Sequence, residues 1–420
     1  MKMMKYWIKR CFERAYILIR WTLLAGTAGV VLGLLGGVFV LCIDKVTELR
    51  MIYSWVVYLM PVAGLIIVAL YQFDKYGTGT NCVLEGVHSG TYVPLRMAPL
   101  IIVSTVITHA VGGSAGREGA ALQLGGSIGG SLGNLMKLDE YDRKIMIMCG
   151  MSGAFAALFG TPLTATVFAM EIISVGIMQY AALVPCAISA LVAERTAVFI
   201  GVKSEAFHLP EGVEIHIKGL LFVALFAVIC AAISILFCKL LHGTDRFMKM
   251  YFQNPWIRIL LGSVVLIALM LAVGSRDYLG TGMNVIVKAL DGEVIAGAFI
   301  LKMIFTSITL GSGFKGGAII PSLFVGATLG CLFGQLTGTL AGIDASIFAA
   351  CGMVAIFCGV TNCPITSLLL GFELFGMEYM PCFLIAVGIS YMESGYFGLY
   401  QSQKLMYSKT KLKFINRKAI

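Results

Sequence analysis

The sequence predicts an all-α polytopic membrane protein made of two inverted repeats of tilted and broken helices. Two observations about composition and one about repetition carry this prediction. Of the 420 residues, 59% are hydrophobic and only 13% are charged, with a mean hydropathy of +0.90. A soluble chain of this length needs more charge to cover its surface. Long apolar stretches recur, and three groups of residues from the first half return in order in the second.

The apolar stretches are long enough to cross a bilayer, for which a helix needs about 20 residues. The clearest candidates are Tyr16–Ile43, Ile52–Tyr71, Gly219–Leu241 and Trp256–Val273. No signal-peptide cleavage site follows the first of them, so we expect a retained helix. The 49 glycines favour close helix packing and unwound backbone where it lines a cavity.

Three blocks of sequence recur at a nearly constant spacing. Segments 77–81, 112–133 and 149–171 match segments 280–284, 313–334 and 351–373, at offsets of 203, 201 and 202 residues. Three matches in the same order indicate a duplication rather than chance. We therefore divide the chain into a first membrane repeat at 1–204, a linker at 205–218 and a second membrane repeat at 219–420.

The charge distribution predicts how the chain is oriented. Basic residues crowd both ends, and cytoplasmic segments beside membrane helices are enriched in lysine and arginine. We expect a cell-membrane protein with both termini in the cytoplasm, and no nucleic-acid partner. The linker has mixed charge and is expected outside, so each repeat crosses the membrane an odd number of times. Two such repeats have opposite orientations, as in many secondary transporters.

Two glycine-rich loops precede predicted helices at repeat-related positions. Residues 112–119 lead into one apolar helix, and residues 316–321 lead into another. The free amides and the positive dipole end of a helix N-terminus attract an anion, and such partial charges still allow its release. Because the repeats are inverted, we expect the two helix starts to meet near the middle of the membrane.

Glu118 is the main functional candidate. Its repeat-related position is Ile319, so the scaffold does not require a carboxylate there, and an ionisable group at membrane depth is a candidate for function. A carboxylate in an anion site takes the anion's place, and protonation lets it swing aside. The alternative is a packing ion pair with Arg117, although adjacent helix positions point in different directions.

Three further residues each have a functional and a structural interpretation. The hydroxyl of Thr78 could face the anion or cap a helix, and both interpretations stay open. The phenol of Tyr396 could donate to an anion without adding charge, but the sequence alone favours an aromatic at the membrane interface. Glu171 has a repeat-related counterpart in Glu373, which favours a structural role at helix ends for both.

These motifs resemble the CLC family of chloride channels and proton-coupled anion antiporters, over roughly Leu24 to Lys409. Three segments are similar to the family's anion-site loops, namely Gly77-Thr78-Gly79, Gly116-Arg117-Glu118-Gly119 and Gly316-Gly317-Ala318-Ile319-Ile320-Pro321. The resemblance implies that Glu118 is the external gating glutamate, and that the amides of Arg117, Glu118 and Gly119 face an outer anion site.

The resemblance also implies a central anion site and an assembly. The site is formed by Thr78, the amides of Ala318 and Ile319, and the hydroxyl of Tyr396. The family fold is a homodimer in the lipid bilayer, with one pore in each subunit, and its ligands are chloride and protons. We expect neither a metal nor another cofactor.

The sequence departs from the family pattern at several positions. Ala120 replaces the usual proline after the gating glutamate, and Asn81 stands where the first loop often has proline. Ile172 stands where family antiporters often carry an inner glutamate, so Glu171 is the candidate for an inner proton route. The third loop is closer to the general chloride pattern than to the fluoride-exporting branch. We expect chloride–proton antiport, with a passive voltage-gated-type chloride channel and a fluoride–proton antiporter as alternatives.

A more remote alternative is an intramembrane serine protease. Gly150-Met151-Ser152-Gly153 resembles the motif of rhomboid-type proteases, whose serine needs a histidine base on a later membrane helix. The later histidines lie in the linker or, as His242, at a segment end. Ser152 corresponds to Val354 in a matching small-residue stretch, so we expect packing rather than enzymatic activity.

Overall fold

The computed structural model describes residues 2–72, 79–204, 206–210 and 216–420. Within them, the first half holds α1 (Lys2–Ile52), η1 (Ser54–Leu59), α2 (Met60–Gln72), α3 (Thr80–Ser89), α4 (Met97–Ala110), α5 (Glu118–Leu135), α6 (Glu140–Phe159), α7 (Pro162–Glu171), η2 (Tyr180–Ala182) and α8 (Leu183–Phe199). The second half holds α9 (Ile217–Tyr251), α10 (Pro255–Val273), α11 (Met283–Leu290), α12 (Ala298–Ser312), α13 (Ile319–Ala341), α14 (Ala345–Thr361), α15 (Pro364–Phe375) and α16 (Met380–Glu393).

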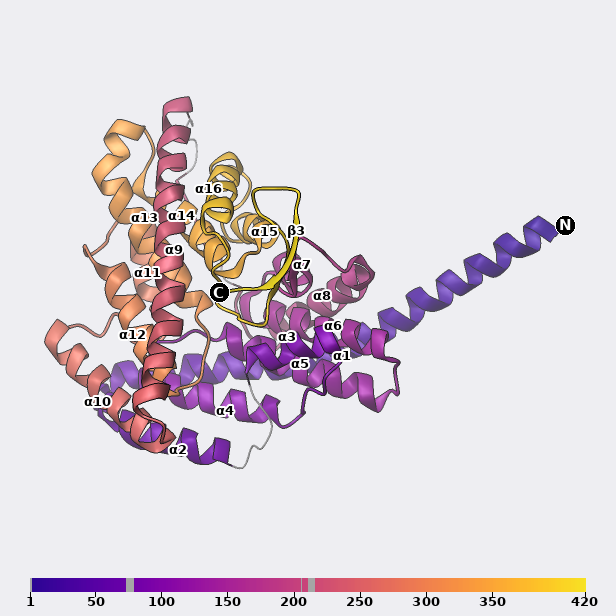
Figure 1. The fold of residues 1–420 in the computed structure, drawn as a ribbon, viewed down its shortest axis with the longest axis horizontal. Helices are drawn as coiled ribbons and strands as arrows, with labels where there is room; N and C mark the ends of the chain where they lie inside the picture. Colours follow the sequence, from indigo (N-terminus) through magenta and orange to yellow (C-terminus); the bar gives the residue numbers. More distant parts are fainter. Residues whose placement is uncertain (1, 73–78, 205, 211–215) are drawn as a thin grey trace.

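The helices of the two halves follow the same order. The helices α3 to α7 contain the repeated blocks of the first half, and α11 to α15 contain their counterparts. Both α7 and α15 begin at a proline, Pro162 and Pro364, a residue suited to the first helical turn. Figure 1 shows the first half, in indigo to magenta, lying beside the second half, in pink to yellow. The N-terminal part of α1 extends away from both.

Six helical segments among the described residues are long and apolar enough to cross a membrane. They are Met3–Ile52, Ser54–Gln72, Tyr180–Phe199, Ile217–Tyr251, Pro255–Val273 and Ile319–Ala341. The four stretches chosen from the sequence coincide with four of these segments. Shorter apolar helices such as α4 and α12 lie between them in the sequence, and α14, α15 and α16 follow the last of them. The predicted polytopic helical architecture is therefore confirmed.

Glycines let the central helices of each half touch backbone to backbone. A Cβ on Gly125 would lie 2.1 Å from the carbonyl oxygen of Gly150, and a Cβ on Gly326 would lie 2.3 Å from that of Gly352. No side chain fits at such distances, so α5 packs on α6, and α13 on α14, closer than larger residues allow. The contact recurs at repeat-related positions, as expected for duplicated halves.

The C-terminus forms a small sheet that the sequence did not predict. Strands β1 (Ser174–Val175) and β2 (Lys404–Tyr407) pair in parallel, and β2 pairs antiparallel with β3 (Phe414–Lys418). The turn between β2 and β3 is tied to the ends of α14 and α16, because the Lys409 ammonium donates to Asn362 Oδ1 at 2.5 Å and Ser394 Oγ at 3.0 Å. The hairpin thus folds back onto the second half.

Candidate functional site

The two glycine loops meet as the sequence analysis expected. Gly116 and Gly317 form an antiparallel bridge in which each amide donates to the other's carbonyl oxygen at 2.7 Å. The helix α5 begins two residues after Gly116, and α13 begins two residues after Gly317. Because the two glycines are repeat-related, the bridge has the reciprocal geometry of a two-fold axis between the halves. It holds both helix starts at one point in the protein interior.

Glu118, the first residue of α5, extends across this junction. Its side chain is fully buried, and Oε1 accepts a hydrogen bond from the amide of Ile320 in the first turn of α13 at 2.8 Å. Glycine is required beside it, because a Cβ on Gly317 would lie 2.5 Å from the backbone nitrogen of Gly119 as well as 2.3 Å from Oε2. The carboxylate therefore occupies the anion-attracting start of the helix from the other half.

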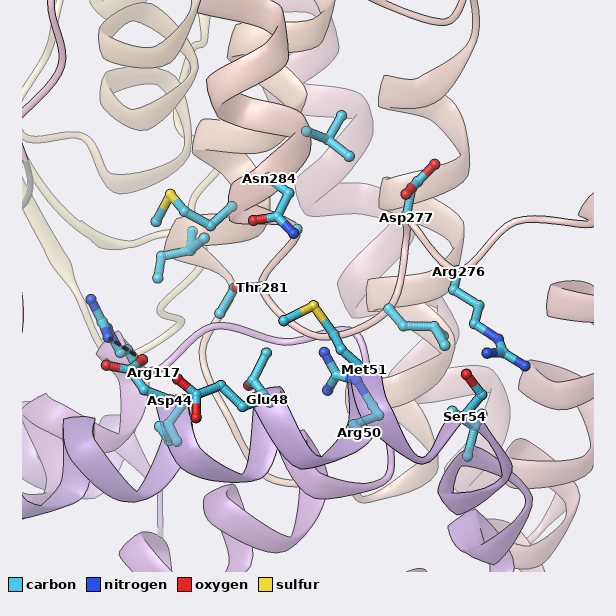
Figure 2. Close-up of a pocket in the computed structure, with 18 residues that line it drawn as sticks. Asp44, Glu48, Arg50, Met51, Ser54, Arg117, Arg276, Asp277, Thr281 and Asn284 are labelled. Carbon is cyan, nitrogen blue, oxygen red and sulfur yellow. Dashed lines mark ion pairs between the residues drawn. The ribbon is translucent and has the colours of Figure 1, made fainter.

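A cavity of about 490 Å³ lies on one side of the junction. It is lined by the C-terminal end of α1, by the loop between α10 and α11, by Arg117 and by Ile320. Figure 2 shows Arg117 beside Asp44 of α1, with an ion pair at 4.0 Å. The Arg117 guanidinium also lies 5.6 Å from the ring centroid of Phe159. We call this space, at the C-terminal end of α1, the outer cavity.

A second cavity, of about 300 Å³, lies on the other side and is here named the inner cavity. Its lining includes backbone of the junction, two residues at the start of α3, three polar residues near the end of α9, and a tyrosine: Gly119, Gly317, Ala318, Thr80, Asn81, His242, Asp245, Lys249 and Tyr400. Ile320 faces the outer cavity while Gly119 and Gly317 face the inner one. The Glu118 carboxylate thus lies between the two spaces.

The structure brings most of the predicted site residues together. Arg117 lines the outer cavity, and Gly119 and Ala318 line the inner one. Ile319 is buried at the start of α13. Thr78 lies outside the described residues.

Tyr396 is placed differently from the expectation. Its hydroxyl donates to Ser408 Oγ at 3.0 Å, and the Arg417 guanidinium lies 4.8 Å from its ring centroid. Both partners belong to the C-terminal hairpin, so the hairpin turns this phenol away from the inner cavity. Tyr396 does not line that cavity, whereas Tyr400 does.

Sequence reasoning missed two hydroxyl residues of the inner cavity. Tyr400 is buried and follows Gly398 in a stretch that holds two tyrosines. Thr80 donates to the carbonyl oxygen of Gly119 at 3.4 Å and accepts from Gln123 Nε2 at 3.3 Å. The available signals were the second tyrosine of the C-terminal stretch and the second threonine of the first loop. Neither could be preferred without knowing which residue faces the junction.

Glu171 and Glu373 cap each other's helices. Glu171 accepts from the amides of Ile365 and Thr366, at 3.1 and 2.8 Å, at the start of α15. Glu373 accepts from the amides of Leu163 and Thr164, at 2.9 and 2.8 Å, at the start of α7. These are free amides of first helical turns, which need an acceptor when buried. Both carboxylates therefore lie at helix ends, in the structural role that their presence in both repeats favoured.

Ser152 has the geometry of a packing residue. It is fully buried in α6, and its hydroxyl donates to the carbonyl oxygen of Cys186 in α8 at 3.1 Å. A nucleophilic serine needs a base to take its proton, and the hydrogen bond here goes to a backbone carbonyl instead. None of the described contacts of Ser152 supports the protease alternative.

Comparison with known proteins identifies one family. Residues 63–395 match the family model described as voltage gated chloride channel. A protein of Pseudomonas syringae pv. tomato named chloride/fluoride channel protein is 33% identical, over 93% of this chain and 87% of its own length. An H⁺/Cl⁻ exchange transporter of Vibrio vulnificus is 26% identical, over 87% and 84% of the two chains.

Solved structures show the same architecture. The crystal structure of a CLC-type fluoride/proton antiporter superposes with a TM-score of 0.88 and 30% identity, covering 92% of this chain and 98% of the other. That of a slow cyanobacterial Cl⁻/H⁺ antiporter gives a TM-score of 0.76 at 19% identity, with coverages of 89% and 94%. These relatives are channels and transporters rather than enzymes.

Proposed function

The chain belongs to the CLC family of anion channels and transporters, and we propose that it exchanges a small anion for protons, with Glu118 as the group that couples the two. One observation carries the proposal: the buried Glu118 carboxylate accepts the Ile320 amide hydrogen bond at the point where the two repeats meet. It lies between two cavities, in the place that a dehydrated anion would take.

The chemistry follows from competition for one set of amides. The starts of α5 and α13 offer N–H groups and positive dipole ends, which the ionised carboxylate of Glu118 satisfies. Protonation removes its charge and weakens its hold on the Ile320 amide, because a hydrogen bond to a charged acceptor is roughly twice as strong as one to a neutral acceptor. The side chain then moves away, an anion enters, and the proton leaves on the other side. A single mobile carboxylate thereby links the two fluxes.

The cavities supply access from the two faces of the membrane. The basic termini favour a cytoplasmic location for both chain ends, which puts the C-terminal end of α1 and the outer cavity on the external side. The inner cavity then opens toward the cytoplasm. The family resemblance also favours a homodimer, which cross-linking of the protein in native membranes would test.

Fluoride is a second candidate for the transported anion beside chloride. Two relatives with at least 30% identity are named for chloride/fluoride and fluoride/proton transport, whereas two relatives named for chloride exchange are 26% and 19% identical. A selectivity series with fluoride, chloride, bromide and nitrate in reconstituted liposomes separates the two. The preferred anion is the one whose outward gradient drives the largest flux.

Reconstitution also tests the exchange itself. With an anion gradient as the only driving force, the purified protein in liposomes should move protons against their own gradient, recorded with a pH electrode. Anion flux without any proton movement would make the protein a passive channel. Liposomes without protein give the background leak.

A further inference from the structure

An exchanger needs a group that takes up protons on the inner side, and Glu171 is badly placed to be that group. Its Oε2 accepts from both the amide and the hydroxyl of Thr366, at 2.8 and 2.6 Å, and its Oε1 accepts from the amide of Ile365. A carboxylate held by three donors stays in place as a helix cap. The next residue, Ile172, cannot titrate.

The inner cavity contains a different candidate. His242, half-buried near the C-terminal end of α9, lines this cavity together with the backbone of Gly119 and Gly317. Those two glycines lie beside Glu118, since a Cβ on Gly317 would lie 2.3 Å from its Oε2. The cavity therefore leads from the His242 ring to the wall against which the Glu118 carboxylate rests.

The His242 ring is held so that one nitrogen can accept a proton. Its Nε2 lies 2.8 Å from the carbonyl oxygen of Gly398, and because a carbonyl only accepts, Nε2 must carry the hydrogen. In the neutral ring, Nδ1 is then the basic nitrogen. Its neighbour is the side-chain amide of Gln401, at 3.5 Å, a distance at which cavity water competes easily.

Among the described residues, α9 itself brings four charged groups near His242. Lys239 and Arg246 lie within about one turn on either side of it and are exposed, with Lys239 5.0 Å from the ring centroid of Phe397. Asp245 and Lys249 line the same cavity and pair with each other at 2.7 Å. The helices packed against α9 are α12, α13, α14 and α16. Among their described residues and the residue that precedes α13, those lining the cavity are uncharged: Leu310, Gly311 and Ala318. The C-terminal segment adds Tyr400 and Gln401, and α3 adds Thr80 and Asn81.

Comparison of the repeats separates His242 from the scaffold. The helix α1 occupies in the first half the position that α9 occupies in the second, and α1 contains no histidine. A histidine at this point is therefore not required to build a long first helix. By the same comparison, Glu118 has no carboxylate counterpart in the second half, whereas Glu171 has one in Glu373.

We propose, on the basis of the proton-coupled function above, that His242 is the inner proton relay to Glu118. Nδ1 takes a proton from hydronium at the cytoplasmic face, which leaves water, and the ring becomes an imidazolium that keeps its Nε2–H bond to Gly398. Nδ1 then releases that proton to a water in the inner cavity, and the ring returns to its neutral form. The resulting hydronium protonates the Glu118 carboxylate, whose Oε2 lies beside Gly317.

Proteoliposomes carrying His242→Gln test the relay. We expect coupled proton transport to fall about a hundredfold, the lower end of the usual contribution of an acid–base group, while anion flux changes less than about twofold. The dependence of proton transport on the pH at the inner face should flatten, because glutamine cannot take up a proton. His208→Gln, an exposed histidine outside the cavity, is the matched control and should behave as wild type.

The outcomes separate this inference from the proposed function. If wild type moves no protons, the exchange itself is wrong. If wild type couples and His242→Gln keeps its proton flux and pH profile, the relay is wrong. Should His242→Gln fail to fold, the smaller His242→Asn is measured in the same assay. Proton flux at the wild-type level in that variant overturns the relay.

Discussion

Glu118 and Ile320 are 202 positions apart in the sequence, yet the amide of one donates to the carboxylate of the other at 2.8 Å. The hydrogen bond joins the first turn of a helix in one half to the first turn of its counterpart in the other. The proposed anion exchange depends on this hydrogen bond, because it places the Glu118 carboxylate at the start of α13, where an anion would otherwise bind.

Removing the phenol of Tyr400 should weaken anion binding. A hydrogen bond to a charged group contributes about 1.5–3 kcal/mol, so Tyr400→Phe should reduce anion affinity by about tenfold or more in calorimetry on the purified protein. Tyr396→Phe is the matched control, because its hydroxyl donates to Ser408. A larger loss of affinity in Tyr396→Phe than in Tyr400→Phe would mean that the wrong tyrosine faces the anion.

Adding a methyl group at Gly317 should disturb the coupling carboxylate. The new Cβ in Gly317→Ala would lie 2.3 Å from Oε2 of Glu118 and 2.5 Å from the backbone nitrogen of Gly119, so the side chain and the start of α5 must both shift. A misplacement of about 1 Å can cost about a hundredfold in rate, and we expect coupled transport to fall at least about tenfold. Gly388→Ala is the control, since nothing lies within 4 Å of its Cβ. Wild-type transport by Gly317→Ala would contradict the position given to Glu118.

The reciprocal caps predict a cost in both halves. Glu171→Gln and Glu373→Gln each replace a charged acceptor for two helix amides by a neutral one, which should lower stability by about 1–3 kcal/mol. Because Glu171 is more buried and also accepts from the Thr366 hydroxyl, melting curves in detergent should shift at least as far for Glu171→Gln as for Glu373→Gln. The ratio of protons to anions should stay at the wild-type value. If Glu171→Gln lost proton transport at unchanged stability, the inner proton route would pass through Glu171 instead of His242.

The C-terminal hairpin predicts a pH-dependent stability. Burial lowers the pKa of Lys409 to about 8, below its ordinary value of about 10.4 in an unfolded chain. Between these values the unfolded chain binds the extra proton, so stability rises with pH across this window, by up to about 3 kcal/mol. The melting temperature of wild type should thus increase from pH 8 to pH 10 relative to that of Lys409→Met. Parallel pH profiles for the two proteins would contradict this effect.

The duplication made much of the fold readable from the sequence. The matching blocks predicted the two glycine loops and the helices that follow them. They also identified Glu171 and Glu373 as counterparts with a role at helix ends, because a residue present in both halves is expected to serve the common scaffold. Features without a repeat were not accessible in this way. The choice between Tyr396 and Tyr400 depends on the hairpin that covers Tyr396, and the hairpin depends on contacts such as that of Lys409 with Asn362, which no local pattern records.

The role proposed for His242 could not be predicted from the sequence either. It stands at the end of an apolar segment, where a lone histidine has no pattern around it. Two structural observations make it a candidate proton carrier. Its Nε2 bonds to the carbonyl oxygen of Gly398, and its ring lines the same cavity as Gly317.

Simultaneous recording of anion and proton flux from liposomes containing wild type or Glu118→Gln tests the central claim most directly. The glutamine has nearly the same size but cannot take up or release the proton. We expect Glu118→Gln to carry anions with no measurable proton movement, while wild type moves both ions in a constant ratio. Proton transport at the wild-type ratio by Glu118→Gln would contradict the account.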